Sequence, residues 1–233
     1  MKAMILAAGR GERLRPLTDR VPKPLLEAGG KPLLAWHLER LAQAGFRDIV
    51  INVSHLGELI ERRFGTGAGF GVTIAWSREA APLETAGGIA QACALLGSEP
   101  FLLLNADIWC DYDFSRARGL RLETRLAHLV LVPNPPHAPR GDFSLRAGTV
   151  GNEAAPRYTY AGIALLAPRL VAGVSAGAKA PLAPLLRAAA SRAEISGELF
   201  QGIWRDAGTA GRLAELETLL RDARMNHDED DRF

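Results

Sequence analysis

The sequence has few of the features that would place this protein in an oxidising compartment or on a polyanion. Its two cysteines, Cys93 and Cys110, show neither the spacing of metal ligands nor a disulfide framework, so we expect two core thiols. Lys and Arg number 28 against 26 Asp and Glu, a formal net charge of +2. A basic stripe with interleaved aromatic residues is also missing, which argues against a nucleic-acid partner.

Long hydrophobic runs are missing too. No apolar segment reaches the length of a membrane span, and the first eight residues lack the charged and apolar regions of a signal peptide. We therefore expect a cytoplasmic protein with no membrane partner. No linker or internal repeat divides the 233 residues, a length that suits one well-buried α/β domain. We place this domain at 1–224 and expect the acidic, apolar-poor tail at 225–233 to be disordered.

Glycines and cations follow the first predicted strand, the apolar run Met4–Ala7. Gly9 and Gly11 can adopt positive φ and lack a Cβ, so backbone N–H groups can close around phosphate oxygens. Arg13 adds a planar group with several donors, and Lys23, between two prolines, adds a compact charge. A G-x-G step alone is more often only a tight turn. Together with the adjoining cations, it predicts a polyphosphate site.

Two other phosphate-binding motifs do not match this loop. Leu14 stands where the dinucleotide-binding motif G-x-G-x-x-G needs its third glycine, and no helix pattern follows at once. No G-K-[ST] step closes the loop as it would in a P-loop.

Strand and helix patterns alternate along the rest of the chain. Apolar residues at helical spacing predict helices, and β-branched or apolar runs predict strands. This repetition is typical of an α/β fold with a parallel, doubly wound sheet. Beyond Met4–Ala7, the predicted strands are Ile49–Val53, Val72–Trp76, Phe101–Leu104, Leu129–Val132 and Tyr158–Leu166. The predicted helices are 31–45, Leu56–Phe64, one ending near Leu96, Leu182–Ala193 and Ala210–Ala223.

A carboxylate follows the apolar strand Phe101–Leu104. The carboxyl ends of buried strands face the ligand crevice of open α/β sheets, which places Asp107 at a candidate site. A desolvated charge is costly there without a cation, so we interpret Asp107 as a Mg²⁺ ligand, with an unpaired loop aspartate as the alternative. Asn105, a neutral donor and acceptor, suits a sugar hydroxyl or amide.

A second candidate site is the segment Glu84-Thr85-Ala86-Gly87-Gly88, which leads into the helix ending near Leu96. Unpaired N–H groups face outward at such a helix start, and the glycines let a flat ring approach the backbone. The alternative is a capping sequence whose glycines serve the packing of the helix on the sheet.

Two residues of the second half are candidate ligand contacts. Asp142, in Arg140-Gly141-Asp142-Phe143, is expected at the start of a strand and can accept hydrogen bonds; a plain turn aspartate is an equal alternative. Gly162 interrupts the strand Tyr158–Leu166 and can let a ligand lie close.

No Ser/His/Asp or Cys/His arrangement typical of nucleophilic catalysis is apparent. We expect His37 to pack or to face solvent rather than to take part in catalysis. His128 and His137 have no evident partners.

Taken together, these segments resemble the sugar-1-phosphate nucleotidyltransferases. The signature of that family is L-A-[GA]-G-x-G-x-R-L-x-P-L-T, followed by P-K-x-L and G-K-P-L. The chain matches it at 6–18, 22–25 and 30–33, with Glu12 where many members carry Thr. The resemblance covers nearly the whole chain and implies the nucleotide-diphospho-sugar transferase fold in a single α/β domain, with a Rossmann-like, doubly wound sheet that is mixed and mainly parallel.

The resemblance also assigns roles. It implies that the glycine loop and Arg13 bind the triphosphate and that Lys23 contacts the phosphates at the reacting centre. It also implies that the segment 84–88 reads the nucleobase and ribose. In related enzymes the second half of the chain makes the sugar pocket, so Asp142 and Gly162 are candidate sugar contacts beside Asn105. Trp204-Arg205-Asp206-Ala207-Gly208-Thr209 is similar to the family's W-x-D-[VIA]-G-T, in which the aspartate is the second metal ligand beside Asp107. The nucleotide-binding positions that we assign are Gly9, Gly11, Glu12, Arg13, Lys23, Glu84, Thr85 and Gly88, and the catalytic ones are Arg13, Lys23, Asp107 and Asp206.

The implied reaction is attack of a sugar 1-phosphate on the α-phosphorus of a nucleoside triphosphate, with Mg²⁺ as cofactor and pyrophosphate as leaving group. The attacking phosphate is already an anion, so catalysis rests on positioning and charge rather than on a general base. The segments 84–88 and 140–143 look most like the uridylyltransferases of cell-wall sugar recycling, which use UTP, and we expect a monomer. The alternatives are a mannose- or heptose-1-phosphate guanylyltransferase and a non-catalytic nucleotide-sugar sensor.

Overall fold

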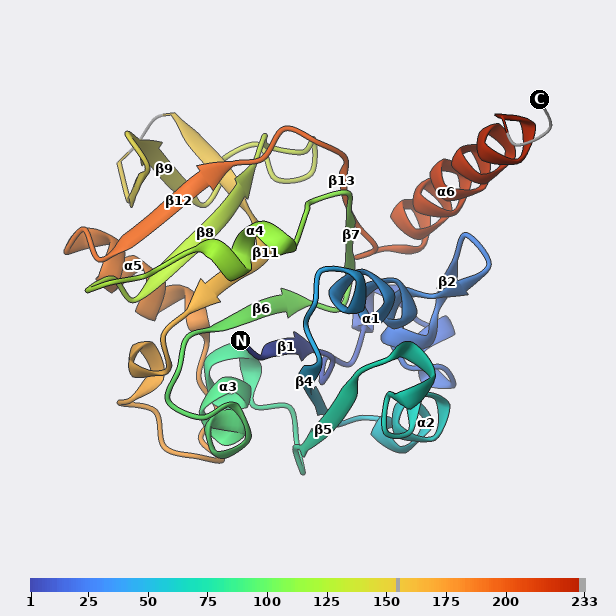
Figure 1. Ribbon diagram of the computed structural model, residues 1–233, viewed down its shortest axis with the longest axis horizontal. Helices are drawn as coiled ribbons and strands as arrows, with labels where there is room; N and C mark the ends of the chain where they lie inside the picture. Colours follow the sequence, from blue (N-terminus) through green and yellow to red (C-terminus); the bar gives the residue numbers. More distant parts are fainter. Residues whose placement is uncertain (154–155, 231–233) are drawn as a thin grey trace.

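The computed structural model describes residues 1–153 and 156–230, except for the side chains of 224–230. Its central element is a nine-stranded sheet that runs from β5 at one end to β9 at the other (Figure 1). Across the sheet the order is β5 (Thr73–Arg78), β4 (Asp48–Val53), β1 (Ala3–Leu6), β6 (Phe101–Asn105), β11 (Arg157–Leu166), β8 (Ala127–Val132), β12 (Ile195–Leu199), β10 (Thr149–Gly151) and β9 (Phe143–Arg146).

The direction of the strands confirms the expected mixed sheet. β5, β4, β1 and β6 are parallel neighbours, and β8 and β12 form a second parallel pair. Between these two groups lies β11, which is antiparallel to both β6 and β8. The carboxyl ends of β1 and β6 therefore meet at one edge of the sheet, with Leu6 opposite Asn105.

Helices cover both faces of the sheet. α1 (Leu33–Gln43) and α2 (Gly57–Phe64) pack on one face, and α3 (Glu84–Leu96) and α5 (Leu182–Ser191) pack on the other. Successive side chains of a strand point to opposite faces, so Met4 belongs to one apolar cluster and Ile5 to the other. Burial on both faces is the reason why these strands are continuously apolar.

The chain also contains the short helix α4 (Ser115–Gly119) and two strands that the sequence patterns do not predict, β10 and β12. β9 begins directly after Asp142, where a strand was expected to start, and it forms a hairpin with β10. Two small ribbons lie outside the main sheet, β2 (Glu27–Ala28) with β3 (Lys31–Pro32) and β7 (Ile108–Cys110) with β13 (Trp204–Asp206).

The last helix is longer than predicted, because α6 spans Ala210–Asp230 rather than ending near Ala223. The tail was predicted to span 225–233. Residues 231–233 lie outside the described residues, and the disorder of the tail stays a prediction. No helix in the described part of the chain is both long and apolar enough to cross a membrane.

α6 packs against the segment that follows the glycine loop. Glu217 Oε2 accepts a hydrogen bond of 2.6 Å from the backbone N–H of Gly29, next to β2. The two parts of the chain share an apolar cluster that includes Leu14, Leu26, Leu33, Leu216 and Leu220. The chain end that follows β13 is thereby fixed to the segment that carries Arg13 and Lys23.

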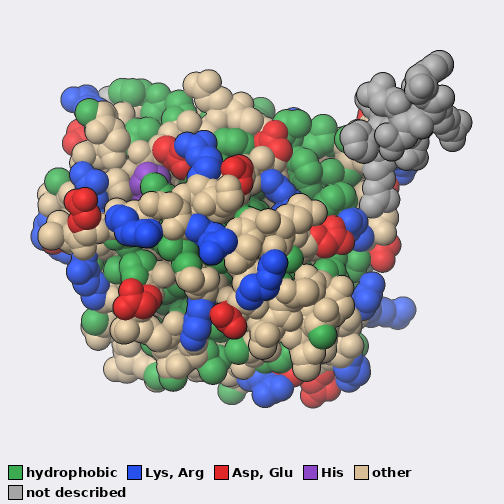
Figure 2. All heavy atoms as spheres, viewed as in Figure 1, with side chains coloured by type: hydrophobic (Ala, Val, Ile, Leu, Met, Phe, Trp, Pro, Cys, Tyr) green, Lys and Arg blue, Asp and Glu red, His purple; other side chains and the backbone are tan. Residues whose placement is uncertain are grey.

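On the face shown in Figure 2, Lys and Arg side chains are scattered among Asp and Glu with hydrophobic atoms between them. This mixed pattern agrees with the small net charge of +2.

His37 packs in the interior. Packing was one of the two expectations for this residue, the other being exposure to solvent. Only 3% of its surface is exposed, and its Nε2 atom is buried without a hydrogen-bond partner. Burial, reinforced by the nearby Arg40 charge, lowers the pKa of the imidazole from 6.5 to about 4, against a hydrogen bond with the backbone of Ile108 that raises it.

This burial predicts an acid-sensitive fold. The folded protein keeps His37 neutral down to about pH 4, whereas the unfolded chain takes up the proton near pH 6.5. The stabilisation is therefore present above pH 6.5 and lost as the pH falls towards 4, by about 3 kcal/mol in the free energy of unfolding. Urea unfolding across this window should show the loss in the wild type and a flatter profile in His37→Leu. An equal loss of unfolding free energy in both proteins over this pH range would exclude His37 as the source of the loss.

Candidate active site

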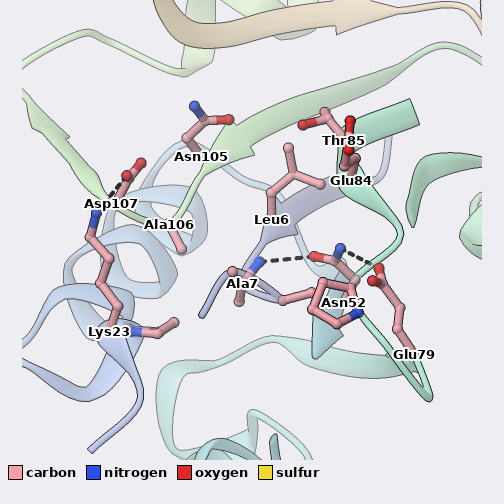
Figure 3. Close-up of a pocket in the computed structure, with 14 residues that line it drawn as sticks. Leu6, Ala7, Lys23, Asn52, Glu79, Glu84, Thr85, Asn105, Ala106 and Asp107 are labelled. Atoms are coloured by element: carbon pink, nitrogen blue, oxygen red, sulfur yellow. Dashed lines mark hydrogen bonds and ion pairs between the residues drawn. The ribbon is translucent and has the colours of Figure 1, made fainter. Parts of the chain in front are cut away.

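The candidate site lies where the carboxyl ends of β1 and β6 meet. The pairing of Leu6 with Asn105 brings the glycine loop next to the segment that leads to Asp107. A cavity of about 220 Å³ opens between them, lined among others by Gly9, Asn105, Asp107 and Thr85 (Figure 3). Ligands of open α/β sheets bind at this kind of crevice.

The two glycines of the loop serve different ends. Gly11 adopts a φ of 65°, and an added Cβ would lie 2.8 Å from Thr18 Cγ2, so this turn requires glycine. Thr18 Oγ1 secures the turn by donating a hydrogen bond of 2.8 Å to Gly11 O. Around Gly9, in contrast, an added Cβ would meet nothing within 4 Å, and its backbone faces the cavity.

Cations surround the outer part of the crevice. A second cavity of about 900 Å³ shares Gly9, Lys23 and Asp107 with the first. Its lining includes Glu12 and four cations, which are Arg10, Arg13, Lys23 and Lys179. Clustered cations beside a glycine loop suit a chain of phosphates.

Lys23 contacts Asp107 directly. It begins the short helix η3 (Lys23–Leu25), and its Nζ lies 2.6 Å from Asp107 Oδ2. The Lys23 side chain is 12% exposed and that of Asp107 34%. The ion pair neutralises a carboxylate at the end of a buried strand, where an uncompensated charge would be costly.

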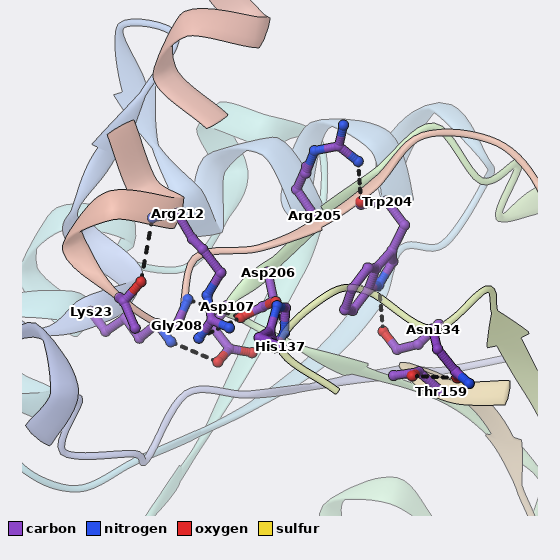
Figure 4. Close-up of polar contacts among 12 residues, drawn as sticks. Lys23, Asp107, Asn134, His137, Thr159, Trp204, Arg205, Asp206, Gly208 and Arg212 are labelled. Carbon is purple, nitrogen blue, oxygen red and sulfur yellow. Dashed lines mark hydrogen bonds and ion pairs between the residues drawn. The ribbon is translucent and has the colours of Figure 1, made fainter. Parts of the chain in front are cut away.

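A two-stranded ribbon brings the second predicted carboxylate to the same place. β7, directly after Asp107, pairs antiparallel with β13, so that Asp206 lies opposite Ile108. The backbone N–H of Ala207 donates a hydrogen bond of 2.8 Å to Asp107 O. The structure therefore places Asp107 and Asp206 side by side, although many residues separate them in the sequence (Figure 4).

Asp206 has three partners of its own. Its Oδ1 lies 3.1 Å from Arg212 Nη2 and accepts a hydrogen bond of 3.1 Å from Gly208 N. Its Oδ2 lies 3.0 Å from His137 Nε2, at ion-pair distance but without hydrogen-bond geometry. The sequence analysis missed Arg212, and it was wrong in finding no partner for His137. Because α6 begins at Ala210, Arg212 lies in its first turn, close to Asp206. The short separation of Asp206 and Arg212 in the sequence was a signal for this contact.

The expectation for His128 was wrong as well. Its Nδ1 lies 2.9 Å from Ser196 Oγ, and its Nε2 lies 3.7 Å from Glu198 Oε1. Tyr112 and Arg116 also contact Glu198, both at 2.6 Å. These residues join β8 and β12 to the segment after β7 and line neither of the cavities around Lys23.

The carboxylate pair fits a hard divalent cation. Among the described residues, no group of three or more His, Cys, Asp and Glu forms a cage that binds a metal through protein ligands alone. Two carboxylates with open positions left for phosphate oxygens and water are the arrangement that Mg²⁺ commonly uses in nucleotide enzymes. Lys23 Nζ, 2.6 Å from Asp107 Oδ2, shows that a positive charge is accommodated at this carboxylate.

The segment 84–88 is only partly open to the cavity. Glu84 and Thr85 line it, but Gly88 does not. The N–H groups of Ala86 and Gly87 both donate to Ala180 O, at 2.9 and 3.1 Å, so these two N–H groups are not the unpaired donors that we expected at this helix start.

The candidate sugar residues are placed differently from one another. Asn105 lines the cavity, and Gly162, at a φ of 75°, packs against it, with an added Cβ only 2.7 Å from Asn105 Nδ2. Asp142 lies just before β9, and its Oδ2 accepts a hydrogen bond of 2.8 Å from Tyr160 N at the bulge in β11. Asp142 thus supports the strand that holds Gly162, and it lines neither cavity around Lys23.

Comparison with known proteins identifies the class of enzyme. The family model for nucleotidyl transferases matches residues 2–140, more than half of the chain, and the chain belongs to this family. It is 51% identical over 229 residues to the N-acetylmuramate alpha-1-phosphate uridylyltransferase of Neisseria meningitidis, covering 94% of this chain and 98% of that one.

Other relatives match a smaller part or only the fold. The mannose-1-phosphate guanylyltransferase catalytic subunit beta of Danio rerio is 47% identical over 117 residues, which cover 49% of this chain and 32% of that protein. A solved structure from Bacillus anthracis, described as a glucose-1-phosphate thymidylyltransferase, superposes with a TM-score of 0.84 over 95% of this chain and 96% of that one, at 22% identity. It confirms the nucleotide-diphospho-sugar transferase fold, and the family generally uses divalent metal ions.

Gly208 provides a test of this geometry. An added Cβ would lie 2.6 Å from Asp206 Oδ1, 2.3 Å from Arg212 Nη2 and 3.1 Å from Arg13 Nη2. Gly208→Ala should therefore displace these groups and lower turnover by about tenfold or more. Gly211→Ala is the matched control, since an added Cβ there meets nothing within 4 Å. Steady-state rates and melting temperatures of the two variants would test this expectation. Equal rates would contradict the predicted displacement of the groups around Gly208.

Proposed function

We propose that this enzyme transfers a uridylyl group from UTP to N-acetylmuramic acid α-1-phosphate, forming UDP-N-acetylmuramic acid and pyrophosphate. The observation that carries the proposal is the 51% identity, over nearly the whole of both chains, to the Neisseria meningitidis uridylyltransferase of that sugar phosphate. The product belongs to the reuse of peptidoglycan sugars in the cytoplasm. The proposal includes a monomer acting on small molecules.

The cations divide the work of holding the nucleotide. Arg13 and the N–H groups near Gly9 and Gly11 bind the β- and γ-phosphates. Lys23 offsets the charge that develops around the α-phosphorus, and it exchanges its contact with Asp107 for contacts with phosphate. Asp107 and Asp206 hold Mg²⁺, which supplies further positive charge beside the phosphates when it is bound.

The attacking group needs no activation by a base. An oxygen of the sugar phosphate attacks the α-phosphorus of UTP, the new P–O bond forms, and the bond to pyrophosphate breaks. The attacking oxygen is already an anion at neutral pH, so the protein contributes position and charge compensation. Asn105 contributes the polar contact to the sugar that its place in the cavity allows.

The roles of the two carboxylates can be tested directly. Asp107→Asn and Asp206→Asn keep the shape of the side chain but remove the charge that holds the metal, so turnover should fall by about 10² or more in each. Turnover over a Mg²⁺ titration and a melting curve would measure this. Asp48→Asn, which changes an exposed carboxylate at the amino end of β4 and away from both cavities, is the control and should retain turnover. A carboxylate variant with wild-type turnover would remove that residue from the mechanism.

The substrates can be tested by pyrophosphate release with Mg²⁺. We would cross UTP and GTP against the 1-phosphates of N-acetylmuramic acid, N-acetylglucosamine and mannose. Release only with UTP and the muramic acid sugar supports the proposal. Release with GTP and mannose 1-phosphate would favour the guanylyltransferase alternative, which the 47% identity over 117 residues motivates. Silence in every combination, with nucleotide still bound, would favour the non-catalytic sensor.

A further inference from the structure

A buried pair of polar side chains lies in the wall of the nucleotide crevice, and the proposed mechanism does not use it. Asn52 is the fifth residue of β4, opposite Leu6 of β1, and Glu79 directly follows β5. Asn52 is 3% exposed and Glu79 is 5% exposed. Both residues also line the cavity of about 220 Å³, on the side opposite Lys23 and Asp107 in Figure 3.

The pair forms a continuous chain of hydrogen bonds between two loops. The N–H of Ala7, at the start of the glycine loop, donates to Asn52 Oδ1 at 2.8 Å. Asn52 Nδ2 then donates to Glu79 Oε1 at 2.7 Å. Glu79 Oε2 finally accepts a hydrogen bond of 2.9 Å from the N–H of Leu83, immediately before Glu84 and Thr85. The phosphate side and the base side of the crevice are therefore connected through these two side chains.

The start of α3 is built around this pair. An added Cβ on Gly88 would lie 2.6 Å from Glu79 Oε1 and 2.7 Å from Asn52 Nδ2. Gly88 thus supports the nucleotide site from behind and leaves room for the pair, which explains why it does not line the cavity. The amino end of α3 also favours a negative charge beside it.

Stability alone is a weak reason to place a carboxylate there. A buried charge is costly unless its oxygens are satisfied, and well-packed apolar residues often stabilise a fold equally well. A fully bonded polar pair, in contrast, fixes the direction and spacing of the segments that it joins. Here those segments are the two loops that the proposed function assigns to the phosphates and the base.

We propose that Asn52 and Glu79 are positioning residues for the nucleoside triphosphate: they set the spacing between the glycine loop and the segment 79–85. This inference rests on the proposed function. Neither side chain needs to touch the reacting atoms. Losing the pair should weaken nucleotide binding and leave the apparent affinity for the sugar phosphate nearly unchanged, because Asn105 and Gly162 lie on the β6–β11 side of the crevice.

The test exchanges the two functional groups. In Glu79→Gln, one donor always faces another donor, either at Asn52 Nδ2 or at the N–H of Leu83. In Asn52→Asp, two carboxylates face each other. In the double variant Asn52→Asp/Glu79→Gln, the new carboxylate at 52 accepts from Ala7 N and from the new amide at 79, whose oxygen accepts from Leu83 N. Only the double variant restores every hydrogen bond.

Calorimetric binding of UTP without sugar phosphate is the main readout, at a temperature where melting curves show all variants folded. Each single variant should raise the Kd for UTP by about tenfold, and the double variant should return it to within about threefold of the wild type. The KM for sugar phosphate should stay within about twofold throughout. Glu61→Gln is the matched control, because Glu61 contacts Arg78, the residue before Glu79, on the exposed surface.

Three outcomes separate the inference from the proposed function. Unchanged Kd values in the single variants, beside a wild type that binds UTP, would overturn the inference alone. Equal losses for UTP and sugar phosphate, or no recovery in the double variant, would show a merely structural role and also overturn it. A wild type that binds GTP but not UTP would overturn the proposed substrate, and the same comparison made with GTP would then decide the inference.

Discussion

Compensation of charge around two neighbouring carboxylates is the constraint on which the site depends. Asp107 and Asp206 would repel each other and lose hydration if they stood alone at the end of the sheet. Lys23 contacts Asp107, and Arg212 and His137 contact Asp206. These partners come from the first loops, from the last helix and from the segment after β8. A charge-balanced site therefore forms only when segments from the whole chain have come together.

The arrangement of the elements follows from this requirement. The β7–β13 ribbon holds the carboxylates together, and α6, which starts just after β13, packs on the segment that carries Arg13 and Lys23. The Asn52–Glu79 pair performs a similar task on the other side, where it joins the glycine loop to the start of α3. The crevice is thus supported from two sides, by the ribbon with α6 on one side and by the Asn52–Glu79 pair in its wall on the other.

Local patterns were sufficient where the determining interaction is local. The Gly9–Arg13 loop follows a strand that is apolar because both of its faces are buried, and Asp107 follows another such strand, so both could be placed at the carboxyl edge of the sheet. Partners were harder to predict. Asp142 bonds to the backbone of Tyr160, and the N–H groups of Ala86 and Gly87 bond to Ala180 O, which no spacing in the sequence indicates.

The sequence by itself determined the class of fold, the glycine loop after the first strand and the family signature, because each depends on residue types at short, regular spacings. Only the tertiary structure decided which side chain meets which. Contacts such as those of Asp206 with His137 and Arg212, or of Glu79 with Asn52, arise between segments distant in the chain. Their physical basis is the need of buried charges and polar groups for partners, and the packing of the folded chain alone specifies which partners are within reach.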